Sequence, residues 1–175
     1  MFNTDQNIPE PELRAILETQ NEIQSLDFSG MEFPEQSFSG KRFTGCCFAG
    51  AKFTEADFSG SRFRMCFFDE AVFNGCRMTN TDIQFSCFAG AKISGCDFRN
   101  SELLHDNFNG IVCENSTFND SDLYNSRFVL STLTKTTFEN CNLKKVLFFR
   151  IFNSDSSFKY SNTREAVFSE GDEPE

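Results

Sequence analysis

An apolar residue returns at nearly every fifth position of this chain, from Phe28 to Phe168, without a single insertion. Of these 29 positions 19 are Phe, and only Asn153 and Thr163 are polar. A period of five fits neither the 3.6-residue helix nor the two-residue strand. Fixed self-similarity of this kind predicts a solenoid, in which each repeat buries its apolar residue by stacking on its neighbours.

Four five-residue units would close one square coil of twenty residues, and the sequence itself supports this period. Positions twenty apart should lie on one side of a four-sided prism. One such set is entirely phenylalanine: Phe28, Phe48, Phe68, Phe88, Phe108, Phe128, Phe148 and Phe168. The set on the opposite side is phenylalanine except at Met78: Phe38, Phe58, Phe98, Phe118, Phe138 and Phe158. We expect both sets to form the structural core.

The order within each unit is a small residue, any residue, Phe or Leu, and two turn-forming residues, as in Ala56-Asp57-Phe58-Ser59-Gly60. This pattern resembles the pentapeptide-repeat family over residues 26–170. The resemblance implies an all-β solenoid, a right-handed quadrilateral parallel β-helix of about seven coils. Its central side chains would fill the interior as stacked ladders, and its backbone hydrogen bonds would join successive coils.

Both ends of the chain differ from the repeat. Residues 1–25 precede it, and the stretch from Pro9 to Glu18 places Leu13, Ile16 and Leu17 at helical spacing. We expect a short helix that caps the first coil, because a solenoid otherwise exposes its core and its strand edges at its ends. Residues 171–175 are acidic, which predicts a disordered tail.

The eight cysteines do not have the spacing of a metal site. Five of them occupy the small inward position of their unit, there is no Cys-x-x-Cys, and His105 is the sole histidine. We expect buried, reduced thiols, although Cys46 over Cys66 and Cys76 over Cys96 leave room for a strained bridge between coils. No metal or cofactor is expected. No nucleophile motif or phosphate-binding loop appears, so we expect no enzyme activity.

No apolar run is long enough to span a bilayer, so we expect no membrane association. The N-terminal segment also lacks the basic and apolar regions of a secretory signal. We therefore expect a cytoplasmic protein.

Outward-pointing apolar residues predict contact surfaces. One group lies near the C-terminal end of the repeat: Val129, Leu147, Phe149, Phe152 and Val167. It is expected to bind a protein partner or a second copy of the chain, unless the tail or a distorted last coil covers it. A second group comprises Met65, Phe67 and Phe85, with Cys47 and Cys87 beside Phe67. Local packing at a corner explains this second group equally well.

Two functions follow. The first is a non-catalytic, protein-binding scaffold built on a rigid prism. The second comes from the resemblance, because Qnr-type fluoroquinolone-resistance members of the family bind DNA gyrase or topoisomerase IV and are thought to imitate duplex DNA. Neither function requires the protein itself to bind nucleic acid. Candidate residues for an acidic, DNA-like surface are Asp57, Asp82, Asp97, Glu102 and Asp122.

Charge distribution bears on the second function. The net charge is −10, but residues 26–170 hold 18 acidic and 15 basic residues, which leaves only −3. Duplex DNA carries one charge per ~1.7 Å of axis, or about 20 over a rod of this length. The repeat is therefore not a uniform polyanion.

Overall fold

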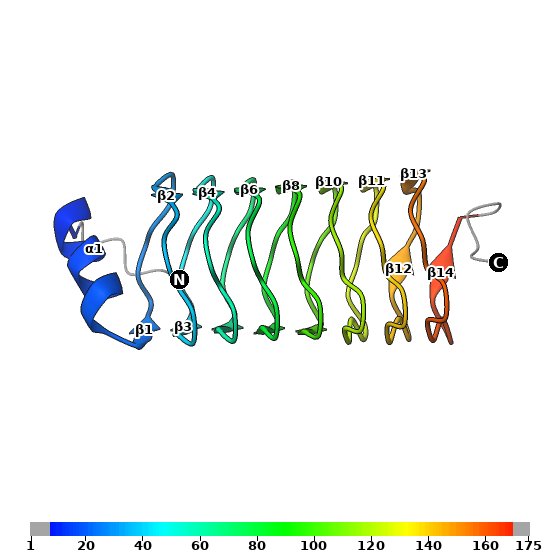
Figure 1. Ribbon diagram of the computed structural model, residues 1–175, viewed down its shortest axis with the longest axis horizontal. Coiled ribbons are helices and arrows are strands. Elements are labelled where there is room, and N and C mark those ends of the chain that lie inside the picture. Colours follow the sequence, from blue (N-terminus) through cyan, green and yellow to red (C-terminus); the bar gives the residue numbers. More distant parts are fainter. Residues whose placement is uncertain (1–7, 170–175) are drawn as a thin grey trace.

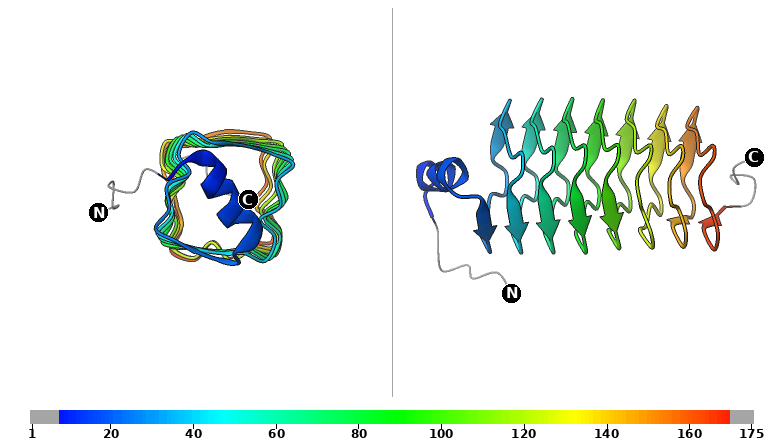
Figure 2. Two further views of the ribbon diagram at one scale, coloured as in Figure 1. Left: turned by 90° about the vertical axis from the view of Figure 1, so that its left-hand side faces the viewer. Right: turned by 60° about the horizontal axis from the view of Figure 1, so that its bottom comes forward.

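The computed structural model describes residues 8–169, so the predicted acidic tail at 171–175 lies outside the described residues. The chain winds into a parallel β-solenoid, a straight rod of stacked coils (Figure 1). Viewed along the rod, the coils superpose into a square outline (Figure 2). This architecture confirms the predicted fold.

We name each side of the rod by its first central phenylalanine. The Phe33 face carries a seven-stranded sheet and the Phe43 face a five-stranded sheet, and all strands pair in parallel with partners twenty residues away. The seven strands are β2 (Glu32–Pro34), β4 (Lys52–Thr54), β6 (Val72–Asn74), β8 (Lys92–Ser94), β10 (Val112–Glu114), β11 (Thr132–Thr134) and β13 (Phe152–Ser154). The five are β1 (Glu22–Gln24), β3 (Arg42–Thr44), β5 (Arg62–Arg64), β7 (Asp82–Gln84) and β9 (Glu102–Leu104).

The other two sides of the square, the Phe28 face and the Phe38 face, are joined mainly by single bridges between coils. Near the C-terminal end the Phe28 face also carries a short pair of strands, β12 (Leu147–Phe148) and β14 (Val167–Phe168). The twenty-residue register holds on all four sides, as the sequence period predicted.

Most units bury their first and third residues, and each unit turns at its fifth. The turn residue adopts a positive φ in unit after unit, which suits glycine at Gly60 (φ +68°) and asparagine at Asn100 (φ +57°). Because these turns recur every five residues, side chains at the second and fourth positions point outward on every face. Outward side chains twenty residues apart therefore lie next to one another in straight columns along the rod, and these columns form its surface.

The interior is a set of ring ladders. Successive rings of the Phe28 face stack nearly parallel, as between Phe68 and Phe88, whose centroids lie 4.7 Å apart. Rings of neighbouring faces meet edge to face, as between Phe38 and Phe43 at 6.0 Å. Both arrangements are favourable for aromatic quadrupoles, in addition to the burial of apolar area. The phenylalanines of the two predicted sets from 28 to 148 are fully buried in the interior of the rod.

The N-terminal end is closed by helix α1 (Glu10–Thr19), which lies across the first coil (Figure 2). Leu13 and Leu17 are buried beneath it, and Arg14 lies 5.6 Å from the centre of the Phe33 ring. The solenoid begins earlier than the boundary at residue 26, because β1 pairs in register with β3. Ile23 supplies the buried central residue of this additional unit.

The C-terminal end differs from the N-terminal end within the described residues. Phe168 stacks on Phe148 at 5.0 Å but remains partly exposed, and the central residue of β13, Asn153, is also exposed. Thr163 is half-buried. The two polar central residues of the repeat, Asn153 and Thr163, therefore both lie in the last coils of the solenoid.

Candidate interaction surfaces

Outward apolar side chains gather on the last coils of the Phe28 face. Leu147 and Val167 are neighbours in adjacent coils, because β12 and β14 pair in register. Phe149 is exposed, and its carbonyl accepts a hydrogen bond from the N–H of Leu130 at 3.1 Å. Val129, next to Leu130 in the chain, is half-buried, so the structure groups four of the five predicted residues on one face.

The fifth predicted residue, Phe152, lies beyond the corner on the Phe33 face and is 65% exposed. Leu130 was not predicted, although it is equally exposed at 65% and occupies the turn with φ +59°. The signal in the sequence was a leucine at the fifth position of its unit, which is often filled by glycine or asparagine. We call the whole set the C-terminal apolar patch: Val129, Leu130, Leu147, Phe149, Phe152 and Val167.

Between residues 86 and 169 the Phe28 face carries no exposed acidic residue. In its coils from residue 86 to residue 169 the sole acidic residue is Asp106, which is buried with 1% of its surface exposed. Two arginines are exposed there. Arg127 has no ion pair within residues 8–169, and the guanidinium of Arg150 lies 5.3 Å from the centre of the Phe149 ring. The patch is therefore apolar and locally basic, on a chain whose net charge is −10.

The five candidate acidic residues lie on two different faces. Asp57 and Asp97 belong to the Phe38 face, whereas Asp82, Glu102 and Asp122 form a column on the Phe43 face. Arginines neutralise three of them. Asp82 pairs with Arg62 and Arg64, Asp57 with Arg77 at 3.8 Å, and Asp97 with Arg99 at 2.7 Å.

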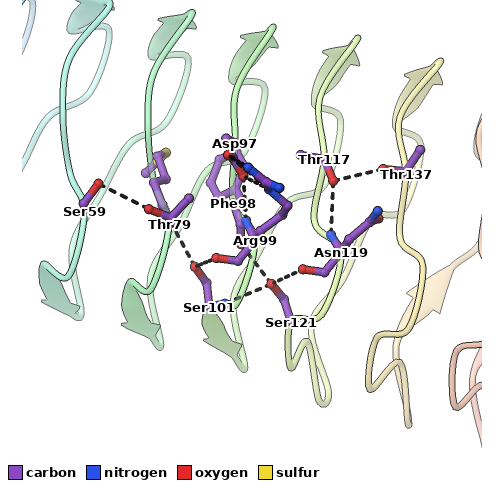
Figure 3. A network of polar contacts seen from close by, with 11 residues as sticks. Ser59, Thr79, Asp97, Phe98, Arg99, Ser101, Thr117, Asn119, Ser121 and Thr137 are labelled. Carbon is purple, nitrogen blue, oxygen red and sulfur yellow. Dashed lines mark hydrogen bonds and ion pairs between the residues drawn. The ribbon is translucent and has the colours of Figure 1, made fainter.

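The Asp97–Arg99 pair lies within a chain of polar contacts that crosses several coils (Figure 3). Hydrogen bonds from Arg99 hold the pKa of the Asp97 carboxyl below its usual value. Beside it, the hydroxyl of Thr137 bonds that of Thr117 at 3.0 Å, and Thr117 accepts from the N–H of Asn119 (Figure 3). The charges of Asp57 and Asp97 are thus paired within the protein, and the five candidate residues do not form one continuous acidic surface.

The predicted group of Met65, Phe67 and Phe85 lies at the corner where the Phe43 face meets the Phe28 face. All three side chains are exposed in part, with Phe85 at 59%. The ring of Phe85 stacks on the ring of His105, one coil further along. This corner is a second candidate surface.

Asp106 lies just inside the same corner and was missed by the sequence reasoning. It occupies the first position of its unit, where neighbouring coils have the small residues Ser86 and Ser126. Burial raises the pKa of its carboxyl well above the ordinary value. An acidic residue at a position otherwise small or apolar was the signal that could have found it.

The cysteines are all free thiols, as predicted. Six are buried and Cys47 and Cys87 are half-buried. Burial raises the pKa of the Cys113 and Cys141 thiols to about 11. Within residues 8–169 no three His, Cys, Asp or Glu side chains are grouped so that they could hold a metal ion. No helix in that range is long and apolar enough to cross a membrane.

A family model described as pentapeptide repeats matches residues 27–64, 37–75, 68–100 and 107–144. No curated protein sequence matches the chain. Among solved structures, the chain is similar to full-length QnrB1, a plasmid-mediated fluoroquinolone resistance protein. The two are 15% identical over 85% of this chain and 93% of QnrB1, with a TM-score of 0.37.

The chain is also similar to HetL, which is involved in the regulation of heterocyst differentiation in the cyanobacterium Nostoc. The identity is 12%, the match covers 95% of this chain and 98% of HetL, and the TM-score is 0.34. At these scores neither structure carries an argument about what this chain binds.

Proposed function

This chain belongs to the pentapeptide-repeat family, and on that basis we propose that it is a non-catalytic scaffold that binds a protein partner through the C-terminal apolar patch. The observation that carries the proposal is the exposure of Leu130, Phe149 and Phe152 on a regular, rigid rod. Contiguous exposed apolar residues on a soluble domain are typical of protein contact sites. A cytoplasmic location fits the eight unpaired thiols.

Charge around the patch favours a partner with acidic residues. Arg127 and Arg150 lie beside the patch, and no acidic side chain is exposed on the same face between residues 86 and 169. A two-fold contact between two copies would place this basic surface against itself, which is repulsive. We therefore favour a different protein over a homodimer, and the experiment distinguishes them.

The test uses Phe149→Asp, with Tyr160→Asp as a matched control, because Tyr160 is an exposed aromatic residue in a turn after the Phe38 face. Affinity capture from the native host should recover a partner with the wild type and the control but not with Phe149→Asp. Light scattering on the purified proteins reports self-association. A wild-type dimer that only Phe149→Asp dissociates would identify the second copy as the partner. Unchanged partners and an unchanged molar mass in all three proteins would refute the proposal.

Binding to DNA gyrase or topoisomerase IV is the more specific alternative that the family suggests. The ion pairs of Asp57, Asp82 and Asp97 argue against it, because an acidic residue already paired with arginine does not imitate a phosphate. A supercoiling assay in the presence of a fluoroquinolone provides the test. We expect no protection at micromolar protein, and protection would establish the alternative.

A further inference from the structure

One corner of the rod carries an exposed row of aromatic side chains that passes into a row of cations. The rings of Phe85 and His105 stack with centroids 5.0 Å apart, and Tyr124 meets His105 edge to face at 5.6 Å. The ammonium group of Lys145 then lies 5.7 Å from the centre of the Tyr124 ring. We call this row, with Met65 at its start and Arg127 beside its end, the corner stripe.

Between residues 44 and 147 this corner has no outward acidic residue, and the same columns meet Asp27 one coil before this stretch and Glu165 one coil after it. Three outward columns run along it, at residues 44 to 144, 45 to 145 and 47 to 147 in steps of twenty. None of these positions is acidic, whereas Arg64, Arg127, Lys144 and Lys145 are basic. Arg64 is engaged by Asp82, and Lys144 and Lys145 each reach Glu165 at 3.7 Å. Arg127 has no ion pair among the described residues. The stripe is apolar toward the N-terminal end and positively charged toward the C-terminal end.

The orientation of the rings limits what can bind. Phe85 and His105 are nearly parallel, with 9° between their planes, and follow one another from coil to coil. Each ring therefore covers a face of its neighbour and turns its edge outward. Aromatic edges carry the positive part of the ring quadrupole, so they suit aliphatic groups and carboxylates. Single-stranded nucleic acid needs open ring faces on which its bases can stack, and this row does not offer them.

The histidine is fixed in this arrangement by its neighbour. The amide group of Asn125, one coil away, lies 2.9 Å from Nδ1 of His105. An amide N–H donates to an unprotonated ring nitrogen, which leaves Nε2–H as the donor of the neutral imidazole. The edge of His105 therefore adds a hydrogen-bond donor between the apolar and the basic parts of the stripe.

We propose that the corner stripe binds an extended acidic peptide, with an apolar side chain over Met65 and Phe85 and carboxylates at Arg127 and Lys145. Four coil spacings of ~4.8 Å separate Met65 from Lys145, so the stripe is about 19 Å long. An extended peptide that rises ~3.3 Å per residue covers this length with about six residues. Charge complementarity supplies the choice of partner, because between residues 44 and 147 the stripe has cations and no acidic residue.

The probe is a fluorescent eight-residue peptide with two leucines at one end, three glutamates at the other and serines between. Fluorescence anisotropy should show saturable binding that weakens as salt is added. Phe85→Asn and Arg127→Glu should each weaken binding by about tenfold, the effect expected of residues central to a contact. Asparagine tolerates the positive φ of Phe85, so this variant should keep the fold.

Val112→Asn is the matched control, since Val112 is a partly exposed apolar residue on the Phe33 face. It should leave the affinity unchanged, and so should Phe149→Asp, which separates this inference from the proposed function. A peptide with lysines in place of the glutamates should not bind. Equal affinity for the two peptides, tighter binding of a twelve-nucleotide oligothymidylate, or wild-type affinity in Phe85→Asn would each overturn the inference.

Discussion

The backbone N–H of Ser86 donates a 2.7 Å hydrogen bond to Oδ1 of Asp106, one coil further along the rod. Serine fills the same role in the adjacent coils. The backbone N–H of Cys66 donates to the hydroxyl of Ser86, and the backbone N–H of Asp106 donates to the hydroxyl of Ser126. Asp106 thus replaces a serine and brings one additional oxygen. That oxygen, Oδ2, is buried and has no hydrogen-bond partner among the described residues.

Replacing Asp106 with serine should stabilise the protein at pH 7. The hydroxyl would keep the bond from Ser86, and removal of the unsatisfied oxygen should raise the free energy of unfolding by about 1–3 kcal/mol. Burial raises the pKa of Asp106 in the folded state, whereas its pKa in the unfolded chain is about 3.9. Above pH ~4 the unfolded state alone releases the proton, so wild-type stability falls as pH rises toward the folded-state pKa.

Denaturant unfolding at pH 3 and pH 7 measures this effect. The advantage of Asp106→Ser should be largest at neutral pH and should shrink below pH ~4, where the carboxyl is protonated in both states. Asp155→Ser, at an exposed turn, is the control and should show no such dependence. A pH-independent difference would mean that Asp106 is not held neutral by burial.

Phe98 should tolerate methionine far better than alanine. Its ring stacks on Phe118 at 4.5 Å, and the next central residue toward the N-terminus in the same ladder is Met78. Phe98→Ala should lower the free energy of unfolding by about 3–5 kcal/mol, because rigid neighbouring coils cannot close the cavity. Phe98→Met should cost less than about 1.5 kcal/mol. Urea unfolding of both variants gives the comparison, and similar losses would count against a tightly packed ladder.

Leu17 should show whether α1 stabilises the first coil. Its side chain is 1% exposed at the closed end of the rod. Leu17→Ala should cost about 2–5 kcal/mol if the helix and the solenoid unfold together. The exposed neighbour Glu18 provides the control, and Glu18→Ala should change stability by less than about 0.5 kcal/mol. Hydrogen exchange would reveal the other outcome, in which the helix detaches and the coils keep their protection.

Cys87 should react slowly with alkylating reagents. Burial and a hydrogen bond to Asp69 raise the pKa of its thiol to about 11, and the sulfur lies 3.0 Å from Oδ1 of that residue. Asp69→Asn removes the negative charge, so the pKa should fall and alkylation at pH 8.5 should become several-fold faster. Mass spectrometry of the modified peptides measures this rate. The rate at Cys47 serves as an internal reference and should not change.

The sequence was sufficient to predict the fold because a central residue recurs at a fixed interval in every five-residue unit. The square outline follows from that regularity, the ladders from the resemblance to the pentapeptide-repeat family, and the capping helix from the spacing of Leu13, Ile16 and Leu17. Ile23 was overlooked because it is not phenylalanine, although it occupies the next earlier central position. Surfaces were harder to predict. The pairing of Arg62 and Arg64 with Asp82 depends on side-chain reach across coils, which residue spacing alone does not specify.

The surface predictions also depended on how much each outward side chain is covered. Val129 and Leu130 are adjacent in sequence, yet Val129 is half-buried and Leu130 is 65% exposed at a turn. Asp106 shows the opposite limit, because its carboxyl is buried although a backbone N–H bonds only one of its two oxygens. Both cases depend on local geometry within one unit, and both mark corners of the rod.

Because the twenty-residue register is uninterrupted, the residue number alone determines how far along the rod a side chain lies and on which side of the rod it lies. Duplication of twenty residues in its middle would lengthen the rod by ~4.8 Å and return every later side chain to its original face. Addition of only five would rotate everything downstream by a quarter turn, and Phe149 would then lie on a different side from Phe85. The number of residues between its two exposed apolar surfaces therefore sets both their distance along the rod and the angle between them about its axis.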